Sequence, residues 1–190
     1  PMIRFNMTRD LRRLSRDSGT RSKLFIPRNN VKIRNLINQS ELFGALETLG
    51  FDQFDNSDHT VADQIAAFAS ADVVVSPHGA GLSNIAYCRP GTIVVELIPQ
   101  GYDQGVTSYR SLSDLFDLRY VPIFCKEYAL AAKGNRCDSD IVADIPYVVD
   151  VVARLLAQHD AGAGVEASGR SSDLPGTETL VGGEAVDAAM

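Results

Sequence analysis

Short apolar runs alternate with amphipathic stretches through the middle of the chain. The runs at 71–75 and 92–98 are rich in β-branched residues and lack alternation, which is typical of strands that are covered on both faces. The apolar runs predict strands at 23–26, 51–54, 71–75, 92–98 and 119–124. Apolar positions spaced three and four residues apart predict helices at 39–49, 60–70, 83–88, 108–116 and 145–159. This alternation predicts an α/β fold, a Rossmann-like parallel sheet flanked by helices.

The two ends of the chain differ in composition from its middle. Its 190 residues suit one domain with additional segments. Residues 160–190 are rich in Gly, Ala, Ser and acids and hold no aromatic residue. Such a segment buries too little apolar surface to offset the entropy lost on ordering. We therefore expect an N-terminal basic helix or arm at 1–22, a folded domain at 23–159 and a disordered acidic tail at 160–190.

The net charge of −6 conceals a basic segment at the start of the chain. Residues 1–36 hold ten Lys and Arg against two acids. A basic block suits an anionic partner, although a solvated basic helix with a few functional arginines explains it equally well. Aromatic residues are scarce within it, so stacking on nucleic-acid bases is not indicated and we expect no nucleic-acid partner.

Several classes of protein are not supported by the sequence. It has no apolar run long enough for a transmembrane helix, and its first residues lack the apolar core of a secretory signal. We expect a bacterial cytoplasmic location, with the Golgi or ER lumen as the alternative if an anchor has been lost upstream. Three cysteines without CxxC spacing argue against a zinc site or disulfide scaffold. No HExxH sequence occurs, and we expect no metal site.

The most informative segment is the glycine-rich turn after the strand at 71–75. It reads Ser-Pro-His-Gly-Ala-Gly-Leu-Ser-Asn, from Ser76 to Asn84. A strand that runs through such a turn into a helix directs backbone N–H groups and the helix dipole at one point, which suits a phosphate. The candidate binding residues are His78, Gly79, Ala80, Gly81 and Asn84. His78, at the strand's carboxyl end, is also our candidate catalytic residue, while a tight structural connection is the plain alternative.

The same turn suggests a second class of ligand. Gly79–Asn84 resembles GxGxxG with its last glycine replaced, so a dinucleotide-binding (NAD or FAD) module is an alternative. Two features oppose it. The turn follows the third expected strand rather than the first. The acidic residue expected about 20 positions on would have to be Glu96, only 15 past Gly81.

Glu96 itself is unusual because it lies within the apolar strand 92–98. A carboxylate in such a strand is costly unless it is paired or used. Near the strand's carboxyl end it could accept hydrogen bonds from a ribose diol. The alternative is a structural ion pair, with Arg28 or Arg34 as possible partners.

Arginines follow the first expected strand. Arg28 and Arg34 should leave the carboxyl end of that strand and face the same crevice as His78. Guanidinium groups bind pyrophosphate oxygens in a bidentate manner, although two solvated arginines are the common alternative. Weaker binding candidates are Asn38, Gln64 and Ser83.

These segments together resemble the family 61 glycosyltransferases, also called the DUF563 or capsular-polysaccharide type, over about residues 23–125. The matching residues include Arg28, Arg34, Asp63-Gln64-Ile65, His78-Gly79-Ala80-Gly81-Leu82-Ser83-Asn84, Pro90-Gly91-Thr92 and Val95-Glu96-Leu97. The resemblance implies one half of a GT-B enzyme that transfers sugar from a nucleotide-sugar donor, usually UDP-linked. Transfer to a glycan or protein hydroxyl would be inverting and metal-independent, without a cofactor.

The resemblance also implies roles for individual residues. The domain at 23–159 would bind the donor, with Arg28 and Arg34 on the diphosphate, His78 and Gly79–Gly81 around the sugar–phosphate and Glu96 on the ribose. A GT-B enzyme has two such halves, so we expect the acceptor half and its general base on an N-terminal segment or a membrane-associated partner. A catalytically inactive truncated domain is a further alternative.

Overall fold

The computed structural model describes residues 21–29, 31–101, 106–129 and 138–168. Most of the expected basic arm and residues 169–190 of the expected tail lie outside these ranges. The chain divides into two compact units, Pro1–Leu155 and Leu156–Met190, and the description below concerns the first. The last helix, α5 (Ile145–Ser168), continues past the boundary expected at residue 159. Within the described residues no helix is both long and apolar enough to cross a membrane.

The core of the first unit is a six-stranded sheet in the order β2-β1-β3-β4-β5-β6. Its strands are β1 (Ser22–Phe25), β2 (Asp52–Gln53), β3 (Ala71–Pro77), β4 (Ile93–Pro99), β5 (Arg119–Ala129) and β6 (Asp140–Val142). All neighbours are parallel except β5 and β6, which are antiparallel. The expected parallel sheet flanked by helices is therefore confirmed, and the antiparallel edge strand is additional.

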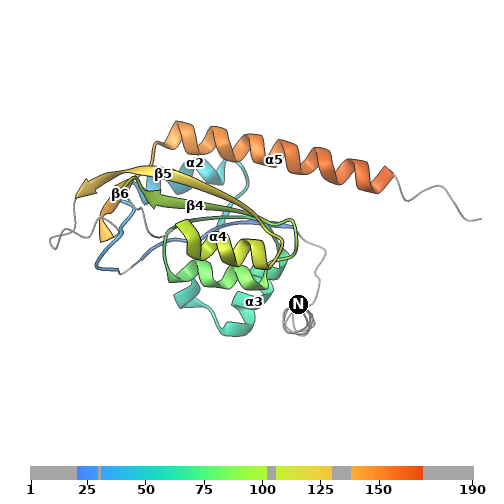
Figure 1. Ribbon diagram of the computed structural model, residues 1–190, viewed down its shortest axis with the longest axis horizontal. Helices are drawn as coiled ribbons and strands as arrows, with labels where there is room; N and C mark the ends of the chain where they lie inside the picture. The colour runs from blue at the N-terminus through green and yellow to red at the C-terminus, as the bar shows by residue number, and fades with distance from the viewer. Residues whose placement is uncertain (1–20, 30, 102–105, 130–137, 169–190) are drawn as a thin grey trace, which may run out of the picture. The chain divides into compact units, whose positions relative to one another are not determined.

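Helices cover both faces of the sheet (Figure 1). They are α2 (Gln39–Glu47), α3 (Val61–Ser70), α4 (Val106–Leu115) and α5, with the 3-10 segments η1 (Asn56–Asp58) and η2 (Ala80–Tyr87). In Figure 1, α3 and α4 lie on one side of the sheet and α2 on the other. Right-handed crossovers explain this distribution. The chain moves in one direction along the sheet from β1 to β2 and in the opposite direction from β2 to β3, so the helices of these two connections lie on opposite sides.

The apolar core explains why the expected elements form. Val73, Val74 and Val75 of β3 are fully buried, as are Val94 and Val95 of β4. Alternate members pack on opposite faces, and Leu24, Val74 and Val94 join the cluster beneath α3, η2 and α4. Continuous β-branched runs are stable here because helices cover both faces.

The start of α3 settles which residue caps this helix. Thr60 is the N-cap, and its hydroxyl accepts the backbone N–H of Asp63 at 3.3 Å while the Asp63 carboxylate accepts the backbone N–H of Thr60 at 3.2 Å. This reciprocal capping box satisfies two donors at the helix end. Asp58, two residues before Thr60, ends η1.

Strand β6 and its contacts are the main feature that the sequence did not predict. The second half of β5 extends beyond β4, which ends opposite Cys125, and pairs with β6. The loop after β1 reaches β6 as well, because the N–H of Ile37 donates to the Ile141 carbonyl at 2.9 Å and the N–H of Ile141 donates to the Asn35 carbonyl at 2.8 Å. Segment 34–38 is thereby fixed to the far edge of the sheet.

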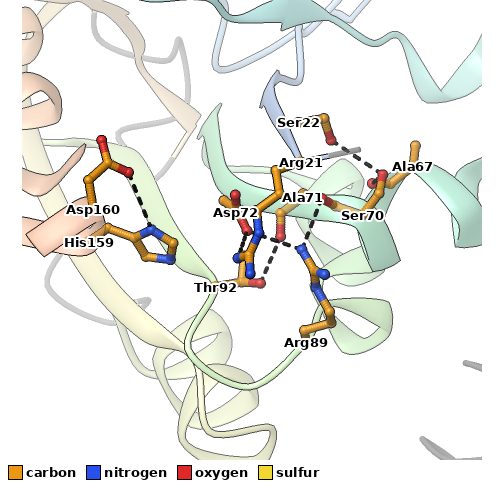
Figure 2. A network of polar contacts seen from close by, with 10 residues as sticks. All are labelled: Arg21, Ser22, Ala67, Ser70, Ala71, Asp72, Arg89, Thr92, His159 and Asp160. Atoms are coloured by element: carbon orange, nitrogen blue, oxygen red, sulfur yellow. Dashed lines mark hydrogen bonds and ion pairs between the residues drawn. The ribbon is translucent and has the colours of Figure 1, made fainter. Parts of the chain in front are cut away.

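The amino ends of the central strands are joined by a charged cluster (Figure 2). The Asp72 carboxylate accepts from Arg21 at 2.9 Å and from Arg89 at 3.1 Å. Arg89 also donates to the Ser70 carbonyl at 3.2 Å. The cluster connects the segments that lead into β1, β3 and β4.

Candidate functional site

The candidate site lies where the carboxyl ends of β1 and β3 adjoin. The chain leaves β1 through α2 and leaves β3 through η2, which packs with α3 on the side of the sheet opposite α2. This divergence makes the place a topological switch point of the kind that binds ligands in open α/β sheets. The strands stay paired to their ends. The N–H of Ile26 donates to the Val75 carbonyl at 2.9 Å, and the buried Ser76 hydroxyl donates to the Ile26 carbonyl at 3.1 Å.

Arg28 crosses directly over Gly79. A Cβ placed on Gly79 would lie 1.6 Å from Nη1 of Arg28, which is far inside any tolerable contact. The backbone of Gly79 is extended, with φ 168°, so glycine is needed here for close approach and not for an unusual dihedral angle. The expected juxtaposition of the first loop and the glycine turn is therefore present.

Arg28 and Arg34 form a pair of like charges. Burial, and then the nearby charge of Arg34, lower the pKa of Arg28. The Nε atoms of both side chains are buried without a hydrogen-bond partner. Among the described residues neither guanidinium has an ion-pair partner, although Arg28 donates from Nη2 to the Ile33 carbonyl at 3.1 Å. Buried donors with an unmatched positive charge are what an anion site needs.

Arg34 also has an unusual backbone conformation. Its φ of 59° lies in the left-handed region, which is costly for a residue with a Cβ unless its surroundings impose it. Here the N–H of Arg34 donates to the Asp138 carbonyl at 3.3 Å, and Asn35 donates from both its backbone and its side chain to the Asp140 carboxylate. Pairing with β6 therefore holds Arg34 in place.

Glu96 is completely buried and has two protein partners. One carboxylate oxygen contacts Nδ1 of His78, and the other accepts the hydroxyl of Tyr120 at 2.5 Å. His78 is itself 7% exposed. The suggested structural partners Arg28 and Arg34 are not the ones found. With both oxygens engaged and no exposed surface, Glu96 is better placed to position His78 than to touch a ribose.

Two tyrosines contact His78, Gly79 or Glu96, and sequence reasoning missed both as site residues. The Tyr109 hydroxyl donates to the Gly79 carbonyl at 2.7 Å, and its ring meets the His78 ring edge-on at 5.4 Å. Tyr120 stands opposite Val94 in the register of β4 and β5. Tyr109 lies on the same helical stripe as Leu112 and Phe116, which was the one available signal that it faces inward.

Asn84 and Gln64, two other expected binding residues, form hydrogen bonds that support the glycine turn. Asn84 donates to the Gln64 side chain at 2.8 Å, and Gln64 donates to the Asn56 carbonyl at 2.8 Å. Asn56 in turn donates to the Gly81 carbonyl at 3.1 Å, so this network fixes the glycine turn against α3. Ala80 and Ser83 are exposed at the start of η2.

Asn38 contacts the chain after β6. Its amide donates to the Ala143 carbonyl at 2.9 Å and accepts the Ala143 N–H at 3.0 Å. This double contact fastens the start of α2 to the chain after β6. The structure thus gives Asn38 a structural contact, and its role as a weak ligand candidate stays a prediction. Among the described residues, no three His, Cys, Asp or Glu side chains are grouped to hold a metal ion.

Comparison with known proteins shows which family the chain is similar to. The family model of glycosyltransferase 61 matches residues 4–95. A rice protein (Oryza sativa subsp. japonica), beta-1,2-xylosyltransferase XAX1, is 32% identical over 131 residues. A frog protein (Xenopus tropicalis), protein O-linked-mannose beta-1,4-N-acetylglucosaminyltransferase 2, is 35% identical over 94 residues.

Residues 4–95 of the chain match glycosyltransferase family 61, and both relatives are named as glycosyltransferases. The aligned regions cover 64% of this chain and 22% of the rice protein, and 46% of this chain and 16% of the frog protein. The chain thus spans about a fifth of the length of these relatives. Within the family 61 match lie Arg28, Arg34, His78 and the glycine turn, whereas Glu96 and the two tyrosines lie beyond its end.

Proposed function

We propose that this chain is the donor-binding part of a glycosyltransferase that uses a UDP-linked sugar. The observation that carries the proposal is the Arg28–Arg34 pair at the switch point, with its buried Nε donors and no ion-pair partner among the described residues. The family 61 match supports transfer of a sugar in general. A nucleoside diphosphate supplies the negative charge and the acceptor oxygens that two guanidinium groups would bind.

The electrostatics of the pair suit a diphosphate leaving group. Arg28 has a lowered pKa because burial and Arg34 both disfavour its charged form, and an anion between the two side chains would relieve both effects. Charge builds up on the diphosphate as the bond to the sugar breaks, so fixed cations there favour the transition state over the ground state. Two arginines would provide the charge that other transferases take from a metal ion.

The transfer itself would be an in-line attack of an acceptor hydroxyl on the anomeric carbon, with inversion. The bond from that carbon to the acceptor oxygen forms as the bond to the diphosphate oxygen breaks, and a base takes the hydroxyl proton. The acceptor is a glycan or glycoprotein hydroxyl, and a second half-domain supplies its site. We assign donor binding, but not the complete reaction, to the residues described here.

Calorimetric titration of the 190-residue chain with UDP, and separately with NAD, in the presence of EDTA tests the proposal. We expect micromolar binding of UDP and none of NAD. Arg34→Gln should weaken UDP binding about tenfold or more, because a hydrogen bond to a charged group is worth about 1.5–3 kcal/mol. The control is Arg154→Gln, which removes an exposed arginine paired to Asp150 on α5.

The outcomes separate the candidate functions. Binding of NAD in place of UDP would support the dinucleotide-binding alternative. Binding of neither nucleotide would overturn the proposal for this chain and favour a truncated domain without donor affinity. If UDP binds only when Mg²⁺ is present, the proposed UDP-linked donor is supported and the proposed metal independence is contradicted.

A further inference from the structure

The hydrogen-bonded chain through Glu96 has a consequence for the chemistry of His78. We propose that Glu96, fixed by Tyr120, is a positioning residue that holds the Nδ1–H of His78 and thereby directs Nε2 toward the diphosphate of a bound donor. The inference about Glu96 stands on the buried contacts alone. The inference about the ligand rests on the proposed donor site.

The first step is the burial of the carboxylate. Glu96 has no exposed surface, and its neighbours along β4 are Val95 and Leu97, both also fully buried. An isolated carboxylate is too costly in such surroundings, so its two contacts must account for its presence. One of these contacts is Tyr120, which can donate its hydroxyl proton to the carboxylate.

The second step is the direction of the proton between Glu96 and His78. An ionised Glu96 side chain only accepts hydrogen bonds, and Nδ1 of His78 is then the donor in their contact. The remaining ring nitrogen, Nε2, lies on the opposite edge of the imidazole. A carboxylate that fixes the tautomer and orientation of a histidine is a recurrent device in active sites.

The third step is the place of the histidine relative to the arginine site. His78 directly precedes Gly79, over which Arg28 lies. Its backbone is held because its N–H donates to the Leu97 carbonyl at 2.9 Å, and its ring is braced by Tyr109 at 5.4 Å. The ring is thus fixed on several sides next to the proposed diphosphate position, which is where preorganised groups contribute most.

Two substitutions of His78 separate its nitrogens. His78→Asn places an amide N–H near the position of Nδ1, so it keeps a donor for Glu96 and removes Nε2. His78→Gln places its amide near the position of Nε2 and leaves Glu96 without that donor. We expect the Asn variant to keep its Tm within a few degrees and lose affinity for inorganic pyrophosphate about tenfold or more. We expect the Gln variant to lose more thermal stability than the Asn variant and retain more of the pyrophosphate affinity.

Long-range ¹H–¹⁵N NMR of the unmodified chain gives an independent readout. We expect His78 to carry a proton on Nδ1 in the absence of any ligand. A neutral ring protonated on Nε2 alone would overturn the positioning role. Equal stability of the two variants, or lower stability of the Asn variant, would overturn it as well.

The ligand assignment has its own outcomes. Unchanged pyrophosphate affinity in His78→Asn would overturn the contact with the diphosphate. If the unmodified chain binds neither UDP nor pyrophosphate, the proposed donor site fails, while the tautomer and the stability comparison still decide the role of Glu96. A direct contact between Glu96 and a ribose predicts a different result, because Glu96→Gln would then weaken binding of uridine and leave pyrophosphate binding unchanged.

Discussion

The guanidinium of Arg28 occupies the space that a side chain on Gly79 would need. The two residues belong to loops after different strands, and a Cβ on Gly79 would meet Nη1 of Arg28 at 1.6 Å. Arg28 can therefore lie in this position only because Gly79 has no side chain.

Gly79→Ala should displace Arg28 with little effect on the fold. The backbone at Gly79 is extended and accepts alanine, while the atom in conflict is the flexible end of an arginine. We expect UDP affinity to fall about tenfold and the free energy of unfolding to change by less than about 1 kcal/mol. Calorimetry and urea unfolding measure the two effects.

The matched control is Gly44→Ala. Gly44 lies within α2, and nothing lies within 4 Å of a Cβ placed there. Alanine should stabilise the helix by about 0.5–1 kcal/mol without changing UDP affinity. Equal UDP affinities in the two variants would show that Arg28 does not depend on Gly79.

Asn38→Ala should destabilise the chain and leave nucleotide binding nearly unchanged. The substitution removes both hydrogen bonds to Ala143 and leaves a backbone donor and acceptor without those partners. We expect a loss of about 1–3 kcal/mol in urea unfolding. A large loss of UDP affinity at unchanged stability would instead support Asn38 as a ligand residue.

Asp72→Asn should weaken the junction at the amino ends of the strands. Asp72 is paired with both Arg21 and Arg89, and its side chain is 15% exposed. Since the arginines are more exposed, we expect a modest loss of about 1 kcal/mol that shrinks as salt screens the pairs. The measurement is urea unfolding at low and high NaCl, and a difference that grows with salt would refute it.

Cys125 should resist alkylation in the folded chain. Burial raises its pKa from 9.0 to about 12, so the reactive thiolate is scarce at ordinary alkaline pH. Because the folded-state pKa is the higher one, its contribution to stability is complete below pH 9 and is lost as the pH rises toward 12. Iodoacetamide treatment at pH 8.5 followed by peptide mapping should modify Cys125 rapidly only after denaturation.

Much of the fold could be predicted because its central strands have a distinctive sequence pattern. The runs around Val73–Val75 and Val94–Val95 are continuous and β-branched, which only a doubly covered sheet explains. Strand β6 could not be found in this way, because it is three residues long and depends on pairing with β5 and the loop after β1. Such pairing is set by tertiary contacts rather than by local pattern.

The candidate site was partly predictable for the same reason. Arg28 and His78 follow strands, and the rule for parallel sheets places both at one edge. The cost of burying a carboxylate marks Glu96 as unusual in the sequence, but it does not predict which residues contact it. Tyr120 meets Glu96 through the register of β4 and β5, and Tyr109 reaches Gly79 through the placement of α4. Neither relation is encoded in local spacing.

The edges of the sheet have a consequence for how the chain behaves at high concentration. The strands at the two edges, β2 and β6, are two and three residues long, and both residues of β2, Asp52 and Gln53, are polar and exposed. A short polar edge offers few backbone groups for a second chain to pair with. The central strands are among the most β-prone in the sequence, yet in the native state they are shielded from neighbouring molecules. Self-association through strand addition should therefore begin only once an edge strand detaches.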